Sequence, residues 1–358
     1  MKHGGNVYEA SRVLKKPVSE ILDFSASINP LGPSPKALRA IQNCAGLVAH
    51  YPDPDCIDLR RTLADHLSQP ASRIVVANGS TELIHLIPHA LKVRRVLIVG
   101  PTFSEYAKAV CLAGGQYSAI HASRKDNYRP PIEYIVPALR STRSARASVD
   151  AVFLCHPNSP TGQVCDPAEL SAVIRKIQRE GVWTILDETF LEYSGVPSMG
   201  TLIQRCPRLI ILRSFTKFYA LPGLRIGYAI ASVPVATVLR EHLPIWSVGS
   251  VGQAAAKAAL TDVTHSRRSR SYTDRERVRF SLKLSQLPGL RVFPSRCNFV
   301  LVEFSSVEVK RAAVWRLRMQ GILVRDCEGV PGLTSRTIRV AIKTSAENDR
   351  LVRALGRD

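Results

Sequence analysis

Lys217 is the residue of this sequence whose type and setting best suit covalent chemistry. It follows a predicted buried strand and lies among hydroxyl side chains in the stretch Ser-Phe-Thr-Lys-Phe-Tyr. A lysine amine forms a Schiff base with an aldehyde once desolvation and neighbouring cations lower its pKa. Ser214, Thr216 and the nearby Arg225 could meanwhile hold a phosphate through charge-assisted hydrogen bonds. Because a lone lysine after a strand is usually a surface residue, Lys217 needs support from other strand ends.

Three further segments place polar groups at the end of a predicted strand or the start of a helix. Asp187 follows an apolar strand, where its carboxylate could keep a ring nitrogen protonated, although a helix-capping acid is an equal alternative. Asn158 lies in a rigid turn with two prolines and could donate a hydrogen bond to a phenolate oxygen. The turn Gly79-Ser80-Thr81 opens a helix, where free backbone N–H groups and the helix dipole favour a phosphate.

An aldehyde, a pyridine nitrogen, a phenolate and a phosphate are together the groups of pyridoxal 5'-phosphate. The four segments, in this order, resemble those of the fold-type I, aspartate-aminotransferase-like enzymes, and the resemblance covers essentially the whole chain. It implies that Lys217 carries the cofactor, that Asp187 is the pyridinium partner and that Asn158 is the phenolate partner. The residues implied to bind the cofactor phosphate are Gly79, Ser80, Thr81, Ser214, Thr216 and Arg225.

Two tyrosines are assigned by the same resemblance. Tyr106, at the end of Pro-Thr-Phe-Ser-Glu-Tyr, is similar to the aromatic residue that stacks on the cofactor ring. Tyr51, in the segment Tyr-Pro-Asp-Pro, resembles the tyrosine that reaches the cofactor phosphate of the neighbouring subunit. The second match implies a homodimer with shared active sites.

Two branches of this class share features with the chain. The Tyr-Pro-Asp-Pro segment and the Ser-x-Thr-Lys-x-Tyr pattern resemble the histidinol-phosphate aminotransferases. Phe190, however, stands where those enzymes usually have a tyrosine that touches the phenolate, and Thr189 replaces an alanine usual in either branch. Other segments resemble the L-threonine-O-3-phosphate decarboxylases of cobalamin biosynthesis more closely, namely residues 3–6, 22–32, 213–219, 244–248 and 331–336.

This second resemblance implies a lyase that decarboxylates L-threonine O-3-phosphate to (R)-1-amino-2-propanol O-2-phosphate. The alternative is a histidinol-phosphate-type aminotransferase that acts on a phosphorylated amino acid. The two reactions use the same residues and differ in which substrate bond is aligned with the cofactor, so residue types alone do not separate them.

Arginines near the C-terminus are candidates for substrate binding, because the planar guanidinium suits carboxylate and phosphate alike. Arg339 resembles the substrate-carboxylate arginine of the family, and Arg325 and Arg336 lie near predicted strands beside it. From the N-terminal arm, the residues that could close over a substrate phosphate are His3, Asn6, Ser27 and Asn29.

These residues need a scaffold that brings strand ends together. Most predicted strands are short and rich in β-branched residues, with Gly, Pro, Asn, Asp or Ser close behind, and helical stretches such as 167–179 separate them. This alternation of strands and helices predicts an α/β fold with an open, mostly parallel sheet flanked by helices. The predicted strands are 74–77, 96–99, 151–155, 184–186, 209–212 and 226–230.

We expect three regions along the chain. Residues 1–40 form an arm that joins the small domain, residues 41–240 form a large cofactor-binding domain, and residues 241–358 form a linking helix and a small α+β domain. Residues 235–280 could be one long helix. The small domain is predicted to contain strands at 300–303, 322–325 and 337–342 around a helix at 307–320.

Composition limits the remaining possibilities. Apolar residues make up 45% and charged residues 22% of the 358 residues, which is typical of soluble globular proteins. No apolar run approaches the roughly 20 residues of a membrane-spanning helix, and no secretory signal is recognisable at the N-terminus, so we expect a cytoplasmic protein without a membrane partner. The eight cysteines form no CxxC pair or ligand-spaced cluster, so no metal site is expected.

A formal net charge of +20 predicts an anionic partner, for which phosphorylated small molecules and nucleic acid are the alternatives. Six arginines lie within residues 267–279, but their positions recur around several faces of a predicted helix. This spacing favours a solvated helix, so we expect a phosphorylated substrate and no nucleic acid.

Overall fold

The computed structural model describes residues 4–144 and 148–356. Its largest sheet has seven strands in the order β2-β8-β7-β6-β5-β3-β4. Strand β8 is antiparallel to both of its neighbours, and all other neighbouring strands are parallel, which confirms the predicted α/β class. The strands are β2 Ile74–Ala77, β3 Arg95–Gly100, β4 Gln116–His121, β5 Ala151–Cys155, β6 Trp183–Asp187, β7 Leu209–Ser214 and β8 Gly227–Ile230.

Strand β4 is the one strand of this sheet that the sequence pattern did not predict. Five of its six residues are exposed, because it forms the edge of the sheet beside β3. An exposed edge strand needs no apolar run, so it carries none of the signal that marks the inner strands.

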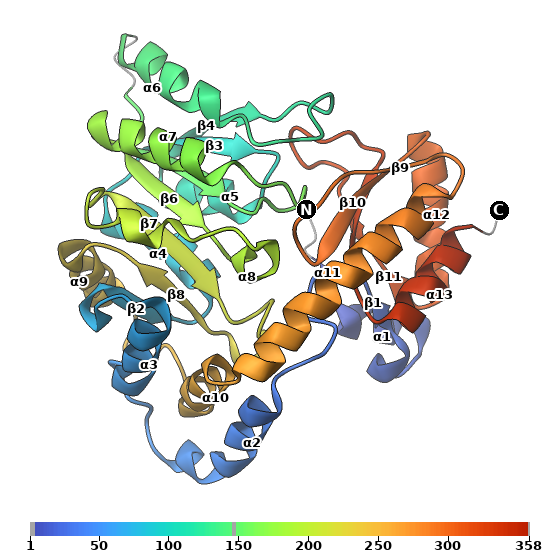
Figure 1. The fold of residues 1–358 in the computed structure, drawn as a ribbon, viewed down its shortest axis with the longest axis horizontal. Helices are drawn as coiled ribbons and strands as arrows, with labels where there is room; N and C mark the ends of the chain where they lie inside the picture. The colour runs from blue at the N-terminus through green and yellow to red at the C-terminus, as the bar shows by residue number, and fades with distance from the viewer. Residues whose placement is uncertain (1–3, 145–147, 357–358) are drawn as a thin grey trace.

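Helices cover both faces of the large sheet (Figure 1). One face packs on α3 (Ile57–Leu67), α6 (Ile135–Ser144) and α7 (Pro167–Arg179), and the other packs on α4 (Ser80–Ala90), α5 (Glu105–Leu112) and α9 (Val233–His242). Strands β5 and β7 are buried along their whole length as a consequence.

Helix α7 shows how the sequence specifies these helices. Asp166 caps its first turn by accepting hydrogen bonds from the backbone N–H groups of Ala168 and Glu169, and Pro167 occupies the first helical position. Leu170, Val173, Ile174 and Ile177 then recur at helical spacing and are buried against the sheet. The observed bounds equal the predicted ones.

A smaller unit contains a four-stranded sheet in the order β12-β13-β10-β9. A separate parallel pair joins β1 (Leu22–Asp23), from the N-terminal arm, to β11 (Ile322–Leu323). The predicted strand 322–325 is therefore two short strands in different sheets. The other elements are α1 Val7–Leu14, β9 Leu290–Val292, β10 Phe299–Phe304, α12 Val307–Met319, β12 Arg325–Asp326, β13 Thr337–Ala341 and α13 Ser345–Leu355.

The possibility of one long helix over residues 235–280 is wrong. The segment contains α9, α10 (Ser250–Leu260) and α11 (Val263–Ser285). Leu243 is extended, as expected of a residue that precedes a proline. Asp262 starts α11 anew by accepting a hydrogen bond from the backbone N–H of His265.

The division of the chain at residues 40 and 240 stays a prediction. Helix α2 (Pro35–Asn43) crosses the first boundary and packs on α10. Helix α11 extends from α8 (Leu191–Ser194) to β9 and α13, so it connects the two units (Figure 1).

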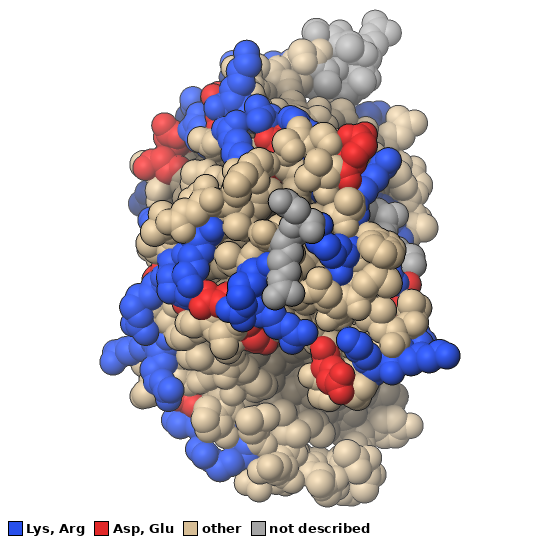
Figure 2. Space-filling model, turned by 90° about the vertical axis from the view of Figure 1, so that its right-hand side faces the viewer, with Lys and Arg blue, Asp and Glu red and all other residues tan. Residues whose placement is uncertain are grey.

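The positive charge is spread over the surface. Figure 2 shows lysines and arginines on the face of the smaller unit in several groups, with acidic and uncharged residues between them. In the arginine-rich part of α11, Arg277 pairs with Asp274 at 2.7 Å, and Arg279 pairs with Glu276 at 2.6 Å. Arg277 and Arg279 therefore form ion pairs within α11 itself.

The first turn of α4 is held against β8 by a glycine. A Cβ added at Gly227 would lie 2.3 Å from the backbone nitrogen of Ser80 and 2.7 Å from the carbonyl carbon of Gly79. Only a residue without a side chain lets strand and helix approach this closely, so Gly227 sets the position of the helix N-terminus.

We expect Gly227→Ala to displace the first turn of α4 and to lower the free energy of unfolding by about 1–3 kcal/mol, as overpacking does. Chemical denaturation measures the loss, and Gly223→Ala is the matched control because a Cβ at Gly223 meets nothing within 4 Å. Equal stability of the two variants would contradict this account of Gly227.

Candidate active site

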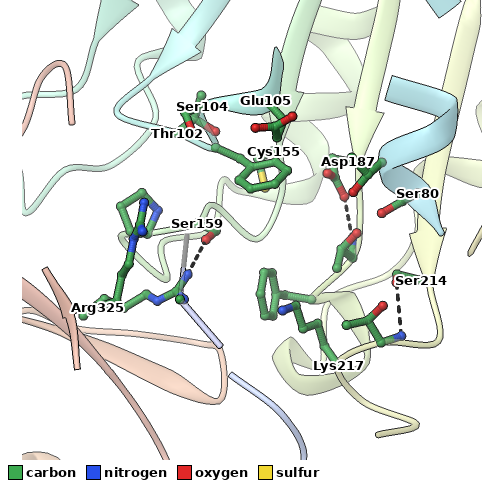
Figure 3. Close-up of a pocket in the computed structure, with 18 of the residues that line it drawn as sticks. Ser80, Thr102, Ser104, Glu105, Cys155, Ser159, Asp187, Ser214, Lys217 and Arg325 are labelled. Atoms are coloured by element: carbon green, nitrogen blue, oxygen red, sulfur yellow. Dashed lines mark hydrogen bonds between the residues drawn. The ribbon is translucent and has the colours of Figure 1, made fainter. Parts of the chain in front are cut away.

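An open cavity of about 420 Å³ lies between the large sheet and the smaller unit (Figure 3). Its walls come from loops that follow β3, β5, β6 and β7, from the first turn of α4 and from residues around β12 and β13. Open α/β sheets bind ligands at this edge, where the parallel strands end. The predicted site residues that line the cavity are Ser80, Thr81, Tyr106, Asp187, Ser214, Thr216, Lys217, Arg225, Arg325 and Arg339.

Lys217 lines this cavity and is partly buried. Desolvation, with the cations Arg339 and Arg225, lowers the pKa of its amine to about 8. The amine lies 6.0 Å from the centre of the Phe190 ring. A lysine with such a pKa is partly neutral near pH 7, as a nucleophilic amine has to be.

The backbone of Lys217 is anchored from two sides. Its carbonyl oxygen accepts a hydrogen bond of 3.1 Å from the hydroxyl of Tyr193 and one of 3.0 Å from the backbone N–H of Asn29. Asn298 in turn donates to the Tyr193 hydroxyl at 3.2 Å. The amine is therefore mounted on a fixed segment.

Asp187 lies at the end of β6, across the cavity from Lys217 (Figure 3). Its carboxylate accepts a hydrogen bond of 2.7 Å from the hydroxyl of Tyr106 and one of 2.9 Å from the backbone N–H of Thr189. Burial raises the pKa of Asp187, because the charged form loses its hydration. A cationic ring nitrogen at this position would stabilise the carboxylate.

The residues predicted to bind the phosphate come together at one corner of the cavity. Gly79 has φ +79°, which favours glycine, and a Cβ there would lie 2.6 Å from a guanidinium nitrogen of Arg225. Ser80 and Thr81 follow in the first turn of α4. These N–H groups, hydroxyls and one arginine form a setting that suits a phosphate.

Tyr106 has a different place from the one expected of a ring-stacking residue. It is fully buried, its ring is stacked on Phe153 with centroids 5.2 Å apart, and its hydroxyl is bound to Asp187. Phe103, three residues earlier, lines the cavity and is only partly buried. The observed role of Tyr106 is to hold Asp187.

Asn158 does not face the cavity, contrary to the prediction that it donates to a phenolate oxygen. Its amide nitrogen donates to the carbonyl oxygen of Pro101 at 2.8 Å and to the hydroxyl of Thr161 at 2.9 Å. It therefore fixes the turn in which it lies. The next residue, Ser159, lines the cavity instead.

The three candidate arginines have different environments. Arg339 donates to the hydroxyl of Ser159 and to the carbonyl oxygen of Ser25, each at 2.9 Å, and burial lowers the pKa of its guanidinium. Arg325 lines the cavity on the same side. Arg336 does not line the cavity and donates to Ser305 and Glu303, so its assignment to the substrate stays a prediction that the structure does not support.

The arm residues also differ from expectation. The amide of Asn29 donates to the carbonyl oxygen of Phe218 and the hydroxyl of Ser269, each at 2.8 Å, so it braces the lysine segment and does not line the cavity. Asn6 caps α1 by accepting a hydrogen bond from the backbone N–H of Glu9 and likewise does not line the cavity. His3 lies outside the described residues.

Tyr51 does not line the cavity of its own chain. Its ring is 77% exposed and is stacked on Trp246 with centroids 4.2 Å apart. Its assignment to the cofactor of a neighbouring subunit stays a prediction.

The cavity wall also includes Phe103, Ser159 and Cys155, which the sequence analysis did not single out. Each of them lies within three residues of one that was singled out. The signal that could have found Cys155 is its position at the end of β5, paired in register with Asp187.

No helix of residues 4–144 and 148–356 combines the length and the apolar character that crossing a membrane requires. The same residues contain no cluster of three His, Cys, Asp or Glu side chains that could bind a metal ion.

The pKa of Lys217 predicts how the cofactor-free protein takes up pyridoxal 5'-phosphate. Only the neutral amine reacts with an aldehyde, so the rate should rise with pH and level off above about 8, whereas an ordinary lysine would need a pH near 10.5. Arg339→Gln removes a cation that lowers this pKa and should move the profile to higher pH. The matched control for Arg339→Gln is Arg336→Gln. A wild-type rate of cofactor uptake that still increases at pH 10 would refute the prediction. Absorbance after rapid mixing measures the rate.

The comparisons with known proteins agree with this geometry. The chain matches the family model described as aminotransferase class I and II over residues 19–355. It is 37% identical over 360 residues to a threonine-phosphate decarboxylase of Salmonella typhimurium, with 99% of this chain and 95% of that protein covered. It is 34% identical over 347 residues to a histidinol-phosphate aminotransferase of Roseiflexus castenholzii, with 95% of this chain and 90% of that protein covered.

A solved structure extends the agreement to the fold. The histidinol-phosphate aminotransferase from Sinorhizobium meliloti, in complex with pyridoxal-5'-phosphate, superposes with a TM-score of 0.86 at 26% sequence identity, covering 98% of this chain and 94% of that chain. Lys217, Asp187 and the first turn of α4 thus surround one cavity, and the chain has the fold of a protein that binds pyridoxal phosphate. The chain belongs to the aminotransferase class I and II family and is a pyridoxal-phosphate-dependent enzyme.

Proposed function

We propose that this enzyme decarboxylates L-threonine O-3-phosphate to (R)-1-amino-2-propanol O-2-phosphate, a reaction of cobalamin biosynthesis. The observation that carries the proposal is the pair Arg325 and Arg339, which line one side of the cavity that also holds Lys217. Two arginines suit a small substrate with two anionic groups, one carboxylate and one phosphate. The similarity to a threonine-phosphate decarboxylase over 99% of the chain supports this reading.

Pyridoxal phosphate, when bound, supplies an electron-accepting ring that stabilises the carbanion left by loss of CO2. For the cofactor, we propose that Lys217 binds the aldehyde carbon and that Asp187 holds the ring nitrogen in its protonated form. The phosphate would lie at the first turn of α4 beside Arg225. Phe103, with its partly exposed ring at the cavity, is better placed than Tyr106 to stack on a flat ring.

Arg339 is prepared to bind a carboxylate. Its two terminal nitrogens are engaged by Ser159 and Ser25, and its side chain lies over the Phe299 ring at 4.9 Å. Its Nε is buried and has no hydrogen-bond partner among the described residues. Because a buried donor without a partner is costly, an anionic ligand that supplies the missing acceptor is favoured.

Arg325 is the candidate for the substrate phosphate. It lies in β12, and its neighbour Asp326 is held by the buried amine of Lys310 at 2.9 Å. This ion pair fixes the strand, while the Arg325 side chain reaches the cavity (Figure 3). An arginine on a fixed strand can bind a phosphate at a defined distance from Lys217.

The alternative is a histidinol-phosphate-type aminotransferase, to which the chain is 34% identical in one relative. In both reactions Lys217 would hold the cofactor until the amino group of the substrate takes its place. They differ in whether the bond to the carboxylate or the bond to hydrogen stands perpendicular to the cofactor ring. Phe190 favours the decarboxylase, because it has no hydroxyl where the aminotransferases usually have a tyrosine.

The assay that separates the two reactions measures CO2 release from L-threonine O-3-phosphate alongside transamination of histidinol phosphate with 2-oxoglutarate. We expect CO2 release and the phosphorylated amino alcohol as product. Lys217→Ala should lower the rate by several orders of magnitude, because the covalent link is lost. Lys125→Ala, an exposed lysine outside the cavity, is the control. Transamination without CO2 release would reverse the assignment.

We also propose a homodimer formed through the surface around Tyr51. Val48 and Tyr51 are 76% and 77% exposed, and Trp246 packs on Tyr51. Gln253 of α10 joins the two segments by donating to the carbonyl oxygens of Asp53 and Val248, each at 2.9 Å. A large exposed apolar area of this kind is typical of a protein–protein interface.

We expect Val48→Glu to shift the protein from dimer to monomer in analytical ultracentrifugation, because a carboxylate would be buried without a partner. Val278→Glu, at a 69% exposed position on α11, should leave the dimer intact. A wild-type protein that sediments as a monomer at micromolar concentration would refute the proposed interface.

A further inference from the structure

We infer that Arg124, in the turn of residues 123–128 after the edge strand β4, is a positioning residue: it holds the smaller unit on the large one and so fixes where the two cavity arginines stand. The inference rests on the proposed function for the role of Arg325 and Arg339 in substrate binding, but not for the contact between the units.

The turn of residues 123–128 is a compact segment of the large unit. The backbone N–H groups of Asp126 and Tyr128 donate to the carbonyl oxygen of Ser123 at 3.2 and 2.9 Å. Asn127 and Tyr128 have φ of +52° and +60°, which lie in the left-handed region. Residues other than glycine disfavour this region, so the contacts around the turn must hold it in place.

Arg124 joins the turn to β10 of the smaller unit. Its Nε donates to the two carboxylate oxygens of Glu303 at 3.0 and 2.8 Å, and its Nη2 donates to one of them at 2.6 Å. Glu303 is buried and also accepts from Thr334 and Arg336. Loss of a guanidinium partner from a buried carboxylate is costly, so this ion pair favours the packed arrangement of the two units.

Tyr128 adds an apolar contact between the units. It is fully buried, and its ring centroid lies 5.1 Å from that of Phe293, which follows β9. Both rings belong to an apolar cluster with Leu301 of β10 and with two residues of the cavity wall, Cys327 and Val330. The turn therefore packs against residues that also form the cavity.

The small sheet connects these contacts to the cavity arginines. In the register of its strands, Arg325 is opposite Arg339, and Arg339 is opposite Leu301. Directly opposite residues of antiparallel strands share a face, and Glu303, two residues after Leu301, lies on that face too. The alternate residues of β10 and β13 pack with α11, α12 and α13 into a separate core. The turn thus binds the same face of the sheet that carries both arginines.

This geometry determines how the ion pair affects substrate binding. While the units are held together, both arginines stand at a fixed distance from Lys217 before a substrate arrives. Without the ion pair, only the correctly packed fraction of molecules binds substrate tightly, and the apparent affinity falls by that fraction. A substrate that spans the distance from Lys217 to the arginines restores the packing once it is bound, so turnover of the bound substrate stays close to normal.

The first test measures CO2 release from L-threonine O-3-phosphate by cofactor-saturated wild type, Arg124→Gln and Arg124→Lys. We expect Arg124→Gln to raise KM by roughly tenfold or more and to change kcat by less than about twofold. Arg124→Lys keeps the charge but not the planar fork, so its KM should lie between the other two. The matched control is Lys125→Ala, which removes an exposed cation of the same turn and should leave KM unchanged. A wild-type KM in Arg124→Gln, or a loss confined to kcat, would overturn the inference.

The second test needs no substrate. The thiol of Cys327 is buried in the apolar cluster beside the turn, whereas that of Cys165 is buried in the core of the large unit. In the cofactor-loaded protein, iodoacetamide should alkylate Cys327 at least about fivefold faster in Arg124→Gln than in wild type, because the opened state is more populated. Mass spectrometry measures both sites, and the rate at Cys165 should stay the same.

An unchanged alkylation rate at Cys327 would contradict the inference. Because this measurement involves no turnover, it decides the role of Arg124 even if the protein releases no CO2 from L-threonine O-3-phosphate, a result that would refute the proposed function alone.

Discussion

The burial of one lysine amine is the condition on which the rest of the site depends. Desolvation disfavours the charged form of Lys217, and Arg339 and Arg225 add repulsion, while Asp187 acts in the opposite direction. The amine needs no counter-ion once it is neutral, so the protein can enclose it without the cost of an unpaired charge. The packing that limits the access of water to this amine therefore keeps more of it in the neutral, reactive form.

The site is assembled from two units that meet only in the folded chain. The large sheet supplies Lys217, Asp187 and the first turn of α4, whereas the smaller unit supplies Arg325 and Arg339. Arg339 ties them together, because it hydrogen-bonds to Ser159 of the large unit and to Ser25 of the arm. The distance between the Lys217 amine and these two arginines is thus set by the packing between the units. Which substrates fit the cavity therefore depends on this packing as well as on the types of the residues that line it.

At several places a residue next to the predicted one lines the cavity, and the physical reason is the same at each place. In a helix such as α7, periodicity tells which side chains face the core, and an unbroken apolar run marks an inner strand such as β5. Turns have no period. Whether Asn158 or Ser159 faces the cavity depends on hydrogen bonds to Pro101 and Thr161, and Pro101 lies in a different loop. The Asn29 amide likewise joins the lysine segment, at Phe218, to Ser269 of α11, which is 240 residues away from Asn29 in the chain.

The sequence alone determined the α/β class and most inner strands, and it singled out the lysine, the acid and the glycine turn that the structure brings to one cavity. These features rest on local signals, namely apolar runs, glycine turns and polar residues at strand ends, which survive in a linear chain. Only the tertiary structure decided that Ser159 lines the cavity in place of Asn158, that Tyr106 holds Asp187, and that Arg336 serves Glu303. The physical reason is that a side chain's direction in a turn is chosen by partners that are distant in sequence, and these become neighbours only when the sheets and the arm have packed.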